Sequence, residues 1–255
     1  MKNIGFIGGG RVTRIILQAL NNKHEKLDHI YAFDINEEVN DRLKKLFPEI
    51  NIADLRTVAT RDYIFLALHP PVIMETLEKI EPVISRDVVI ISLAPKITID
   101  RIASTLSKTK KIIRLIPNAT SIRNEGYNPI CFHAEFPEED KNLINQFLGK
   151  LGTTFEVAES KLEAYAMISA MAPTYFWFQW DELCRIGSQM ELNKQEVEDA
   201  IYFTMMYGLN TMFKSGFSRE ELYDLIPVKP IGEHETEIRK IFSEKLLGLY
   251  DKIKP

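Results

Sequence analysis

The chain has 255 residues, of which 45% are hydrophobic and 27% are charged, and its formal net charge is −4 at pH 7. This composition is typical of a globular protein with one or two domains, and it lacks the basic surface typical of nucleic-acid-binding proteins. No apolar stretch reaches the roughly 18 residues needed to cross a membrane, so we expect neither nucleic acid nor membrane as a partner.

Short apolar runs alternate with amphipathic stretches over the first part of the chain, which is typical of parallel strands joined by helices. The runs are nearly continuous in hydrophobic residues, as in strands buried on both faces of a sheet. We expect strands at 4–7, 29–34, 62–68, 87–93, 111–116 and 153–157, and helices at 14–20 and 37–47. Residues 1–157 are therefore predicted to form a Rossmann-type, doubly wound α/β domain.

Residues 158–255 are predicted to form a second, all-α domain. Helical patterns cover 160–188, interrupted only at Pro173, and then 193–215, 218–226 and 233–253. Methionine and aromatic side chains crowd more than one helix face, which indicates burial on several sides. Burial against a second copy of the chain would explain this surface, so we expect a homodimer formed through the helical domain. A helix bundle with an aromatic core inside one chain is the alternative.

A glycine-rich motif, Gly8-Gly9-Gly10-Arg11-Val12-Thr13, follows the first predicted strand and opens the first predicted helix. It matches Gly-x-Gly-x-x-Thr, and this strand–loop–helix context is typical of a dinucleotide-binding loop. Gly8 would permit the tight turn, and Gly10 would let a pyrophosphate approach the backbone. The helix N-terminus, with Arg11 and Val12, would bind the phosphates.

Asp34 ends the second predicted strand. A carboxylate at this place accepts hydrogen bonds from the adenosine ribose of NAD and repels the 2′-phosphate of NADP. No basic residue follows within residues 35–38, so Asp34 favours NADH over NADPH as the cofactor. The alternative is that Asp34 caps the next helix.

Motifs along nearly the whole chain resemble those of pyrroline-5-carboxylate reductases, the dimer-forming enzymes that complete proline synthesis. Residues 4–10 resemble the family's opening Ile-Gly-Phe-Ile-Gly-Gly-Gly, and residues 114–118 resemble its Arg-Val-Met-Pro-Asn. Residues 65–70 are similar to the family's strand ending in Val-Lys-Pro, and residues 91–98 to its Ile-Ser-Ile-Ala-Ala-Gly-Val-Thr. Residues 169–175 are similar to its Ser-Gly-Ser-Gly-Pro-Ala-Tyr. The resemblance implies an NAD(P)H-dependent reductase of a cyclic imino acid.

The resemblance and the expected strand ends together suggest where cofactor and substrate bind. Cofactor contacts are expected from Leu68, His69, Pro70, Ala94 and Asn118, and substrate contacts from Ser169, Ala172 and Pro173. Asn118 would hydrogen-bond the carboxamide of the nicotinamide or the substrate. The alternative is that Asn118 is only a turn residue after Pro117. His69 would stack or hydrogen-bond near the adenosine or pyrophosphate, or it is a loop residue. Lys96 replaces a family glycine, either as a substrate contact or as a solvated charge.

The chain departs from the family at the loop that the resemblance places in the imino-acid pocket. After Asp224 the family continues Val-Thr-Ser-Pro-Gly-Gly-Thr-Thr, whereas residues 225–234 contain two prolines, which cannot donate amide hydrogens. Two family glycines have also become Ala170 and Ala172. These changes alter the predicted substrate site and leave the predicted cofactor domain untouched.

Three residues in or near these motifs are the candidates for catalysis. Tyr175 lies in the stretch that resembles the family's pocket motif, and Lys229 and His234 lie in the altered loop. Lys229 would anchor a carboxylate. His234 would act as a general acid, because its ordinary pKa lies close to neutrality, or it is an exposed polar group at a helix start.

We therefore predict an NAD(P)H-dependent oxidoreductase that reduces 1-pyrroline-5-carboxylate, or a related small imino or keto acid, by hydride transfer. The alternative, favoured by the altered loop, is a catalytically diverged nucleotide-binding regulatory protein of the same fold. A relative of the hydroxyacid dehydrogenases is a third possibility, but the first helix between the predicted domains has no Lys-x-x-x-Asn pair to support it. Two isolated cysteines, Cys131 and Cys184, fit a cytoplasmic protein, and the five histidines show no metal-ligand spacing.

Overall fold

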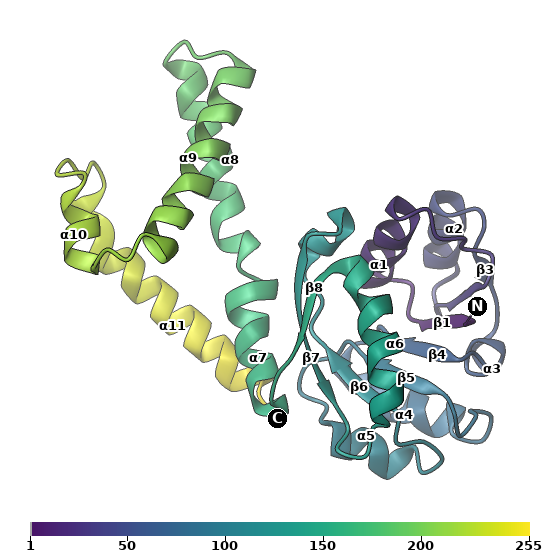
Figure 1. Cartoon of the computed structure of the whole chain (residues 1–255). Coiled ribbons are helices and arrows are strands. Elements are labelled where there is room, and N and C mark those ends of the chain that lie inside the picture. The colour runs from purple at the N-terminus through teal and green to yellow at the C-terminus, as the bar shows by residue number, and fades with distance from the viewer. Residues whose placement is uncertain (1) are drawn as a thin grey trace. The chain divides into compact units, whose positions relative to one another are not determined.

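The computed structural model describes residues 2–255 and divides them into two compact units. The first unit comprises residues 2–171 together with 250–255, and the second comprises residues 172–249. The first unit contains a sheet flanked by helices, whereas the second is entirely helical (Figure 1). The predicted fold class, a Rossmann-type α/β sheet followed by a helical region, is confirmed.

An eight-stranded sheet with the order β3-β2-β1-β4-β5-β6-β7-β8 forms the centre of the first unit. Strands β6 and β7 pair antiparallel, and all other neighbours run parallel. The chain leaves β1 toward β2 and β3 and then returns to place β4 on the other side of β1, so a topological switch point lies beside β1. The strands are β1 (Ile4–Ile7), β2 (Ile30–Phe33), β3 (Asn51–Ile52), β4 (Tyr63–Leu66), β5 (Val89–Ser92), β6 (Ile112–Leu115), β7 (Gly126–Phe132) and β8 (Gly152–Glu156).

Helices cover both faces of this sheet (Figure 1). One face is covered by α1 (Arg11–Asn22), α2 (Glu37–Leu46) and α6 (Glu138–Leu148). The other face is covered by α3 (Leu55–Val58), α4 (Pro70–Ile80) and α5 (Ile99–Thr105). The central strands β1, β4, β5 and β6 are buried along their whole length, which explains why they are almost continuously hydrophobic in sequence.

Two strands were missed by the sequence analysis. β7 contains Asn128 and Pro129, residue types that are depleted in strands, and β3 has only two residues. β7 is also the strand that runs antiparallel to β6, so the regular alternation of strand and helix ends there. The six predicted strands are confirmed with slightly shifted ends.

The segment after β8 is not one long helix interrupted only at Pro173, and that prediction was wrong. A 3-10 turn, Glu159–Lys161, is followed by α7 (Leu162–Tyr165) and by a π-helical segment, Ala166–Ala170, before α8 (Pro173–Gln189) begins. Pro173 has no amide hydrogen to donate to the carbonyl of the preceding turn, so regular α-helical bonding cannot continue into it. The helix therefore changes its hydrogen bonding ahead of the proline.

Contacts in the first unit continue beyond the end of the sheet. Leu162 and Ala166 are buried against Ile116, and Ile253 near the C-terminus packs on the same cluster. The C-terminus accordingly lies beside α7 (Figure 1). The contact-defined division falls after Met171, whereas the domain boundary at residue 157 stays a prediction.

The second unit contains α8, α9 (Lys194–Lys214), α10 (Arg219–Asp224), a 3-10 turn, Gly232–His234, and most of α11 (Glu235–Ile253). α8 and α9 pack side by side (Figure 1). A capping box starts α9: the Asn193 side chain accepts the Glu196 amide and the Glu196 carboxylate accepts the Asn193 amide. Among the described residues α9 buries only Val197, so one chain does not form the alternative aromatic core.

Candidate nucleotide and substrate site

The glycine-rich loop joins the carboxyl end of β1 to the start of α1. Gly8 has φ = 102°, and a Cβ at this position would lie 2.3 Å from the carbonyl oxygen of Ala67, so only glycine fits. Thr13 is buried in the first turn of α1, and its hydroxyl donates a hydrogen bond to the Gly8 carbonyl at 2.5 Å. Thr13 therefore ties α1 to the loop from the position of the third motif glycine.

Gly10 precedes α1 as its N-cap and has different surroundings. A Cβ at Gly10 would meet no atom within 4 Å. Arg11 is exposed at the first position of the helix, and Val12 is half-buried against the core. Open space in front of a helix N-terminus suits a phosphate, since the backbone amides there point outward. The loop therefore fits a pyrophosphate that a side chain at residue 10 would displace.

Asp34 follows β2 and holds the glycine loop. Its Oδ2 accepts the Gly9 amide at 2.8 Å and its Oδ1 accepts the Asn36 amide at 2.9 Å. The alternative role, capping of α2, belongs instead to Asn36, whose side chain accepts the Glu38 amide. A carboxylate has about four lone-pair positions, so Asp34 keeps acceptor capacity for a ribose hydroxyl.

A hollow of about 230 Å³ lies beside the loop and is lined by Gly8 and Asp34. Lys79 also lines it, but its ammonium pairs with the Glu75 carboxylate at 2.6 Å. Apolar walls beside a carboxylate are the chemistry of an adenosine pocket. The apolar walls include Ile7, Phe33, Ile35, Leu55, Leu68 and Val72.

The end of β4 brings a second helix N-terminus to the same edge of the sheet. His69 is the N-cap residue of α4, and Pro70 is its first residue. The His69 side chain is exposed and caps no amide of the helix. β4 is the direct neighbour of β1, so these residues lie one strand away from the glycine loop.

Asn118 follows β6 and links two motifs. It is buried, its Oδ1 accepts the Thr120 amide at 3.1 Å, and its Nδ2 donates to the Ser169 carbonyl at 3.2 Å. That carbonyl lies one helical turn before Pro173, which has no amide to offer it. Ser169 in turn donates its hydroxyl to the Tyr127 carbonyl at 3.2 Å. Asn118 is thus a turn residue that fixes the expected substrate motif, and its contact with a cofactor stays a prediction.

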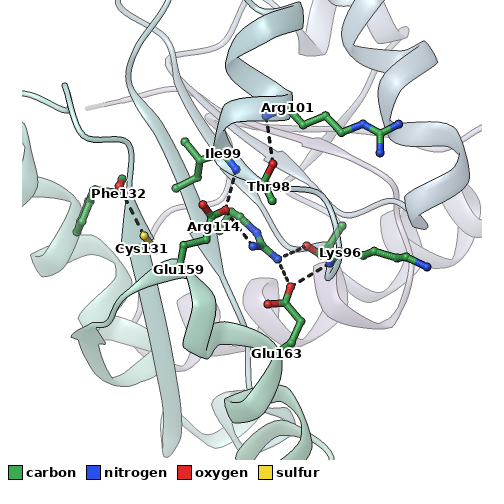
Figure 2. Close-up of polar contacts among 10 residues, drawn as sticks. Lys96, Thr98, Ile99, Arg101, Arg114, Cys131, Phe132, Glu159 and Glu163 are labelled. Atoms are coloured by element: carbon green, nitrogen blue, oxygen red, sulfur yellow. Dashed lines mark hydrogen bonds and ion pairs between the residues drawn. The ribbon is translucent and has the colours of Figure 1, made fainter. Parts of the chain in front are cut away.

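A buried ion-pair cluster lies behind the ends of β5 and β6 (Figure 2). The Arg114 guanidinium is fully buried and pairs with Glu163, which is 1% exposed, and with Glu159 at 2.9 Å. Sequence analysis noted Arg114 only as part of a motif and assigned it no role. The signal was a charged residue inside an otherwise apolar strand, because a buried charge needs a partner.

This cluster holds the loop that follows β5. Glu163 accepts the Lys96 amide at 3.0 Å, and Glu159 accepts the Ile99 amide at 2.7 Å. Arg114 also donates to the carbonyl of Ala94, which is buried, at 3.4 Å. Three charged side chains therefore fix the backbone at the carboxyl edge where the cofactor is expected.

Cys131 lies on β7 near the same cluster (Figure 2). Burial, and secondarily the negative charge of Glu159, raises the pKa of the Cys131 thiol to about 11. The protonated thiol therefore dominates at pH 8, where we expect alkylation by iodoacetamide to be at least about tenfold slower than for a free cysteine. Peptide mass spectrometry after timed quenching measures the rate. Alkylation of Cys131 as fast as free cysteine would contradict this expectation.

The three candidate catalytic residues belong to the second unit, where Tyr175 and Lys229 line different hollows. Tyr175 lines a hollow of about 280 Å³ with Phe242, and Lys229 lines another of about 570 Å³. His234 is exposed in the 3-10 turn before α11, within 3.4 Å of Glu233. Partial burial raises the pKa of the Tyr175 phenol, so it remains protonated at neutral pH. Their catalytic roles stay predictions.

The expected substrate contacts are divided between the units. Ser169 belongs to the first, whereas Ala172 and Pro173 begin the second. Within residues 2–255, no group of three or more His, Cys, Asp or Glu side chains is placed to hold a metal ion. No helix in that range is long and apolar enough to span a membrane.

The family model described as NADP oxidoreductase coenzyme F420-dependent matches residues 3–96. The matched residues include the glycine loop, Asp34 and the first part of the loop after β5. Together with the strand order, this match indicates the class of the protein: a Rossmann fold of the kind found in NAD(P)-dependent oxidoreductases.

Similarity over most of the chain narrows this class. A pyrroline-5-carboxylate reductase of Staphylococcus haemolyticus is 25% identical over 223 residues, which cover 85% of this chain and 81% of that protein. The solved structure of a Coxiella burnetii pyrroline-5-carboxylate reductase has a TM-score of 0.71 and 24% identity, covering 99% of this chain and 94% of its own. The solved structure of Plasmodium falciparum pyrroline carboxylate reductase with NADP bound has a TM-score of 0.78 and 18% identity, and the match covers 99% of this chain and 95% of that one. The predicted resemblance is confirmed: the chain is similar to pyrroline-5-carboxylate reductases over most of its length.

Proposed function

We propose that the chain is an NAD(P)H-dependent reductase that transfers hydride to the C=N bond of 1-pyrroline-5-carboxylate, or to a related small imino or keto acid. The observation that carries this proposal is the glycine loop, where Gly8 admits no side chain and Gly10 leaves an open helix N-terminus. Similarity to pyrroline-5-carboxylate reductases supports the substrate class.

The carboxyl edge of the sheet supplies the groups that would hold the cofactor. Gly10 and Arg11 would bind the pyrophosphate, and Asp34 would bind the adenosine ribose. Ala94 and Asn118, beyond β4, would face the nicotinamide half. The reduced nicotinamide supplies the hydride.

The chain's own contribution to the reaction is to orient the substrate and to deliver a proton. Tyr175 and His234 are the proposed proton donors, and Lys229, in the altered loop, is a proposed further contact to the substrate. The Tyr175 phenol is protonated at neutral pH, so it carries a proton that it could donate.

We propose NADH as the preferred cofactor, because the Asp34 carboxylate repels a 2′-phosphate and Lys79 is already paired with Glu75. We expect NADH to bind at least about tenfold more tightly than NADPH, measured by titration of nicotinamide fluorescence. Asp34→Asn removes the charge and should reduce this preference. Asp41→Asn, an exposed acid on α2, is the matched control and should leave it unchanged. Tighter binding of NADPH by the unaltered chain would contradict the assignment.

We also propose that the helical unit mediates a homodimer. Large side chains of α9, including Tyr207, Leu209 and Phe213, are more than half exposed in one chain, and covering them in a large apolar interface would stabilise the protein. We expect light scattering at micromolar concentration to give twice 29.4 kDa.

Paired Leu209→Glu and Phe213→Glu substitutions should place two charges in that interface and shift the mass toward one chain. Lys214→Glu, at the end of the same helix, is the charge control and should remain dimeric. A one-chain mass for the unaltered protein at every concentration would refute the dimer. The two cysteines form no disulfide, which suits the cytoplasmic location that we propose.

A further inference from the structure

Lys96 has a backbone conformation that a lysine rarely adopts. Its φ is 74°, in the left-handed region that favours glycine. A non-glycine residue stays in this region only when its surroundings hold it there, and such residues gather at functional sites. The conformation therefore raises the question of what holds Lys96 and what its side chain does.

The buried cluster supplies the restraint. Glu163 accepts the Lys96 amide at 3.0 Å, and Arg114 pairs with Glu163 while donating to the carbonyl of Ala94. Arg114 and Glu163 are almost completely shielded from water, so their positions are set by packing as well as by charge. The direction in which the Lys96 side chain leaves the backbone, along its Cα–Cβ bond, is therefore fixed.

Among residues 2–255, no Asp or Glu carboxylate oxygen lies within 4.0 Å of the Lys96 ammonium nitrogen. Figure 2 shows its side chain leading away from the Glu163 carboxylate. The side chain is exposed. A free positive charge is thus presented at a defined place on the surface.

The strand order locates this charge relative to the expected cofactor. Lys96 follows β5, which lies between β4, leading to His69, and β6, leading to Asn118. Asp34 follows β2, on the opposite side of the glycine loop. With adenosine on the Asp34 side, the reacting half of a dinucleotide would lie near β4 and β5, which is the Lys96 side.

We propose that Lys96 binds the carboxylate of the substrate, with Arg114 and Glu163 as the positioning residues that aim it. This inference rests on the proposed function and commits it to a substrate that carries a carboxylate. A keto acid and an imino acid share this group, so Lys96 selects for the anion and leaves the choice of the reducible bond to other residues.

The test compares L-proline with L-prolinamide, which differ in the carboxylate, as ligands of the full chain with oxidised cofactor. Isothermal titration calorimetry is expected to show tighter binding of proline. Lys96→Gln should weaken proline binding at least about tenfold and leave prolinamide and cofactor binding unchanged. Lys96→Arg keeps the charge and should retain most of the affinity. Lys110→Gln, an exposed lysine at the opposite edge of the sheet, is the control and should bind proline normally.

The outcomes separate this inference from the proposed function. Reduction of 1-pyrroline-5-carboxylate with the same KM in Lys96→Gln, and with unchanged proline affinity, overturns the role of Lys96 and leaves the function standing. Binding of proline through Lys96 without reduction of any imino or keto acid supports Lys96 and overturns the reductase. If the unaltered protein neither binds proline nor reduces an imino or keto acid, both the role of Lys96 and the proposed function are overturned.

Discussion

Arg114→Gln is expected to destabilise the protein by about 3 to 5 kcal/mol, because it leaves the Glu163 carboxylate buried without its cation. Glu159 would lose the same partner, although it is 28% exposed and can be partly solvated. Urea denaturation followed by circular dichroism of the full chain measures the loss. We further expect the loop after β5 to become more mobile, since its carbonyl and amide contacts depend on this cluster.

Arg101→Gln is the matched control for this substitution. Arg101 is an exposed arginine on α5, near Arg114, and its side chain points away from the cluster (Figure 2). Its removal should change stability by no more than about 0.5 kcal/mol. The double variant Arg114→Gln with Glu163→Gln should recover part of the loss, because no uncompensated carboxylate then remains at residue 163. Equal stability of Arg114→Gln and Arg101→Gln would disprove the structural role of the cluster.

Gly10→Val is expected to abolish most dinucleotide binding while leaving the fold intact. A side chain at Gly10 points into open space, so folding is not opposed, but it would fill the place of the pyrophosphate. We expect NADH affinity to fall at least about 100-fold and the thermal midpoint to move by no more than a few degrees. Fluorescence titration and differential scanning calorimetry measure the two effects.

Two further glycine variants make this result specific. Gly149 also has open space around its Cβ position and lies at the end of α6, so Gly149→Val should bind NADH normally. Gly8→Ala should unfold much more readily, since its Cβ would approach the Ala67 carbonyl oxygen to 2.3 Å at φ = 102°. Normal NADH binding by Gly10→Val would show that the phosphates lie elsewhere.

Local patterns were enough to predict the sheet and its nucleotide loop. Strands buried on both faces are nearly continuous in hydrophobic residues, and the turn at Gly8 can be formed only by glycine, so both features are visible in the sequence. β7 was missed because a proline and an asparagine interrupt it. The π-helical segment before Pro173 could not be placed, since one of its carbonyls, that of Ser169, accepts a hydrogen bond from Asn118, which is 51 residues away.

The buried cluster shows why other parts of the site escape sequence analysis. Arg114 is separated from Glu159 and Glu163 by 45 and 49 residues, and no local rule pairs charges across such a distance. The Lys96 amide, in its left-handed backbone, is likewise bound by Glu163, which is 67 residues away. The candidate residues Tyr175, Lys229 and His234 came from motif resemblance, and within the second unit Tyr175 and Lys229 line different hollows.

The central claim is tested most directly by following the consumption of reduced nicotinamide by the 255-residue chain in the presence of 1-pyrroline-5-carboxylate. The account predicts loss of nicotinamide absorbance that requires the substrate, is faster with NADH than with NADPH and is absent from Gly10→Val. Tight cofactor binding without turnover of 1-pyrroline-5-carboxylate or any small imino or keto acid would contradict it and would favour a nucleotide-binding regulatory protein.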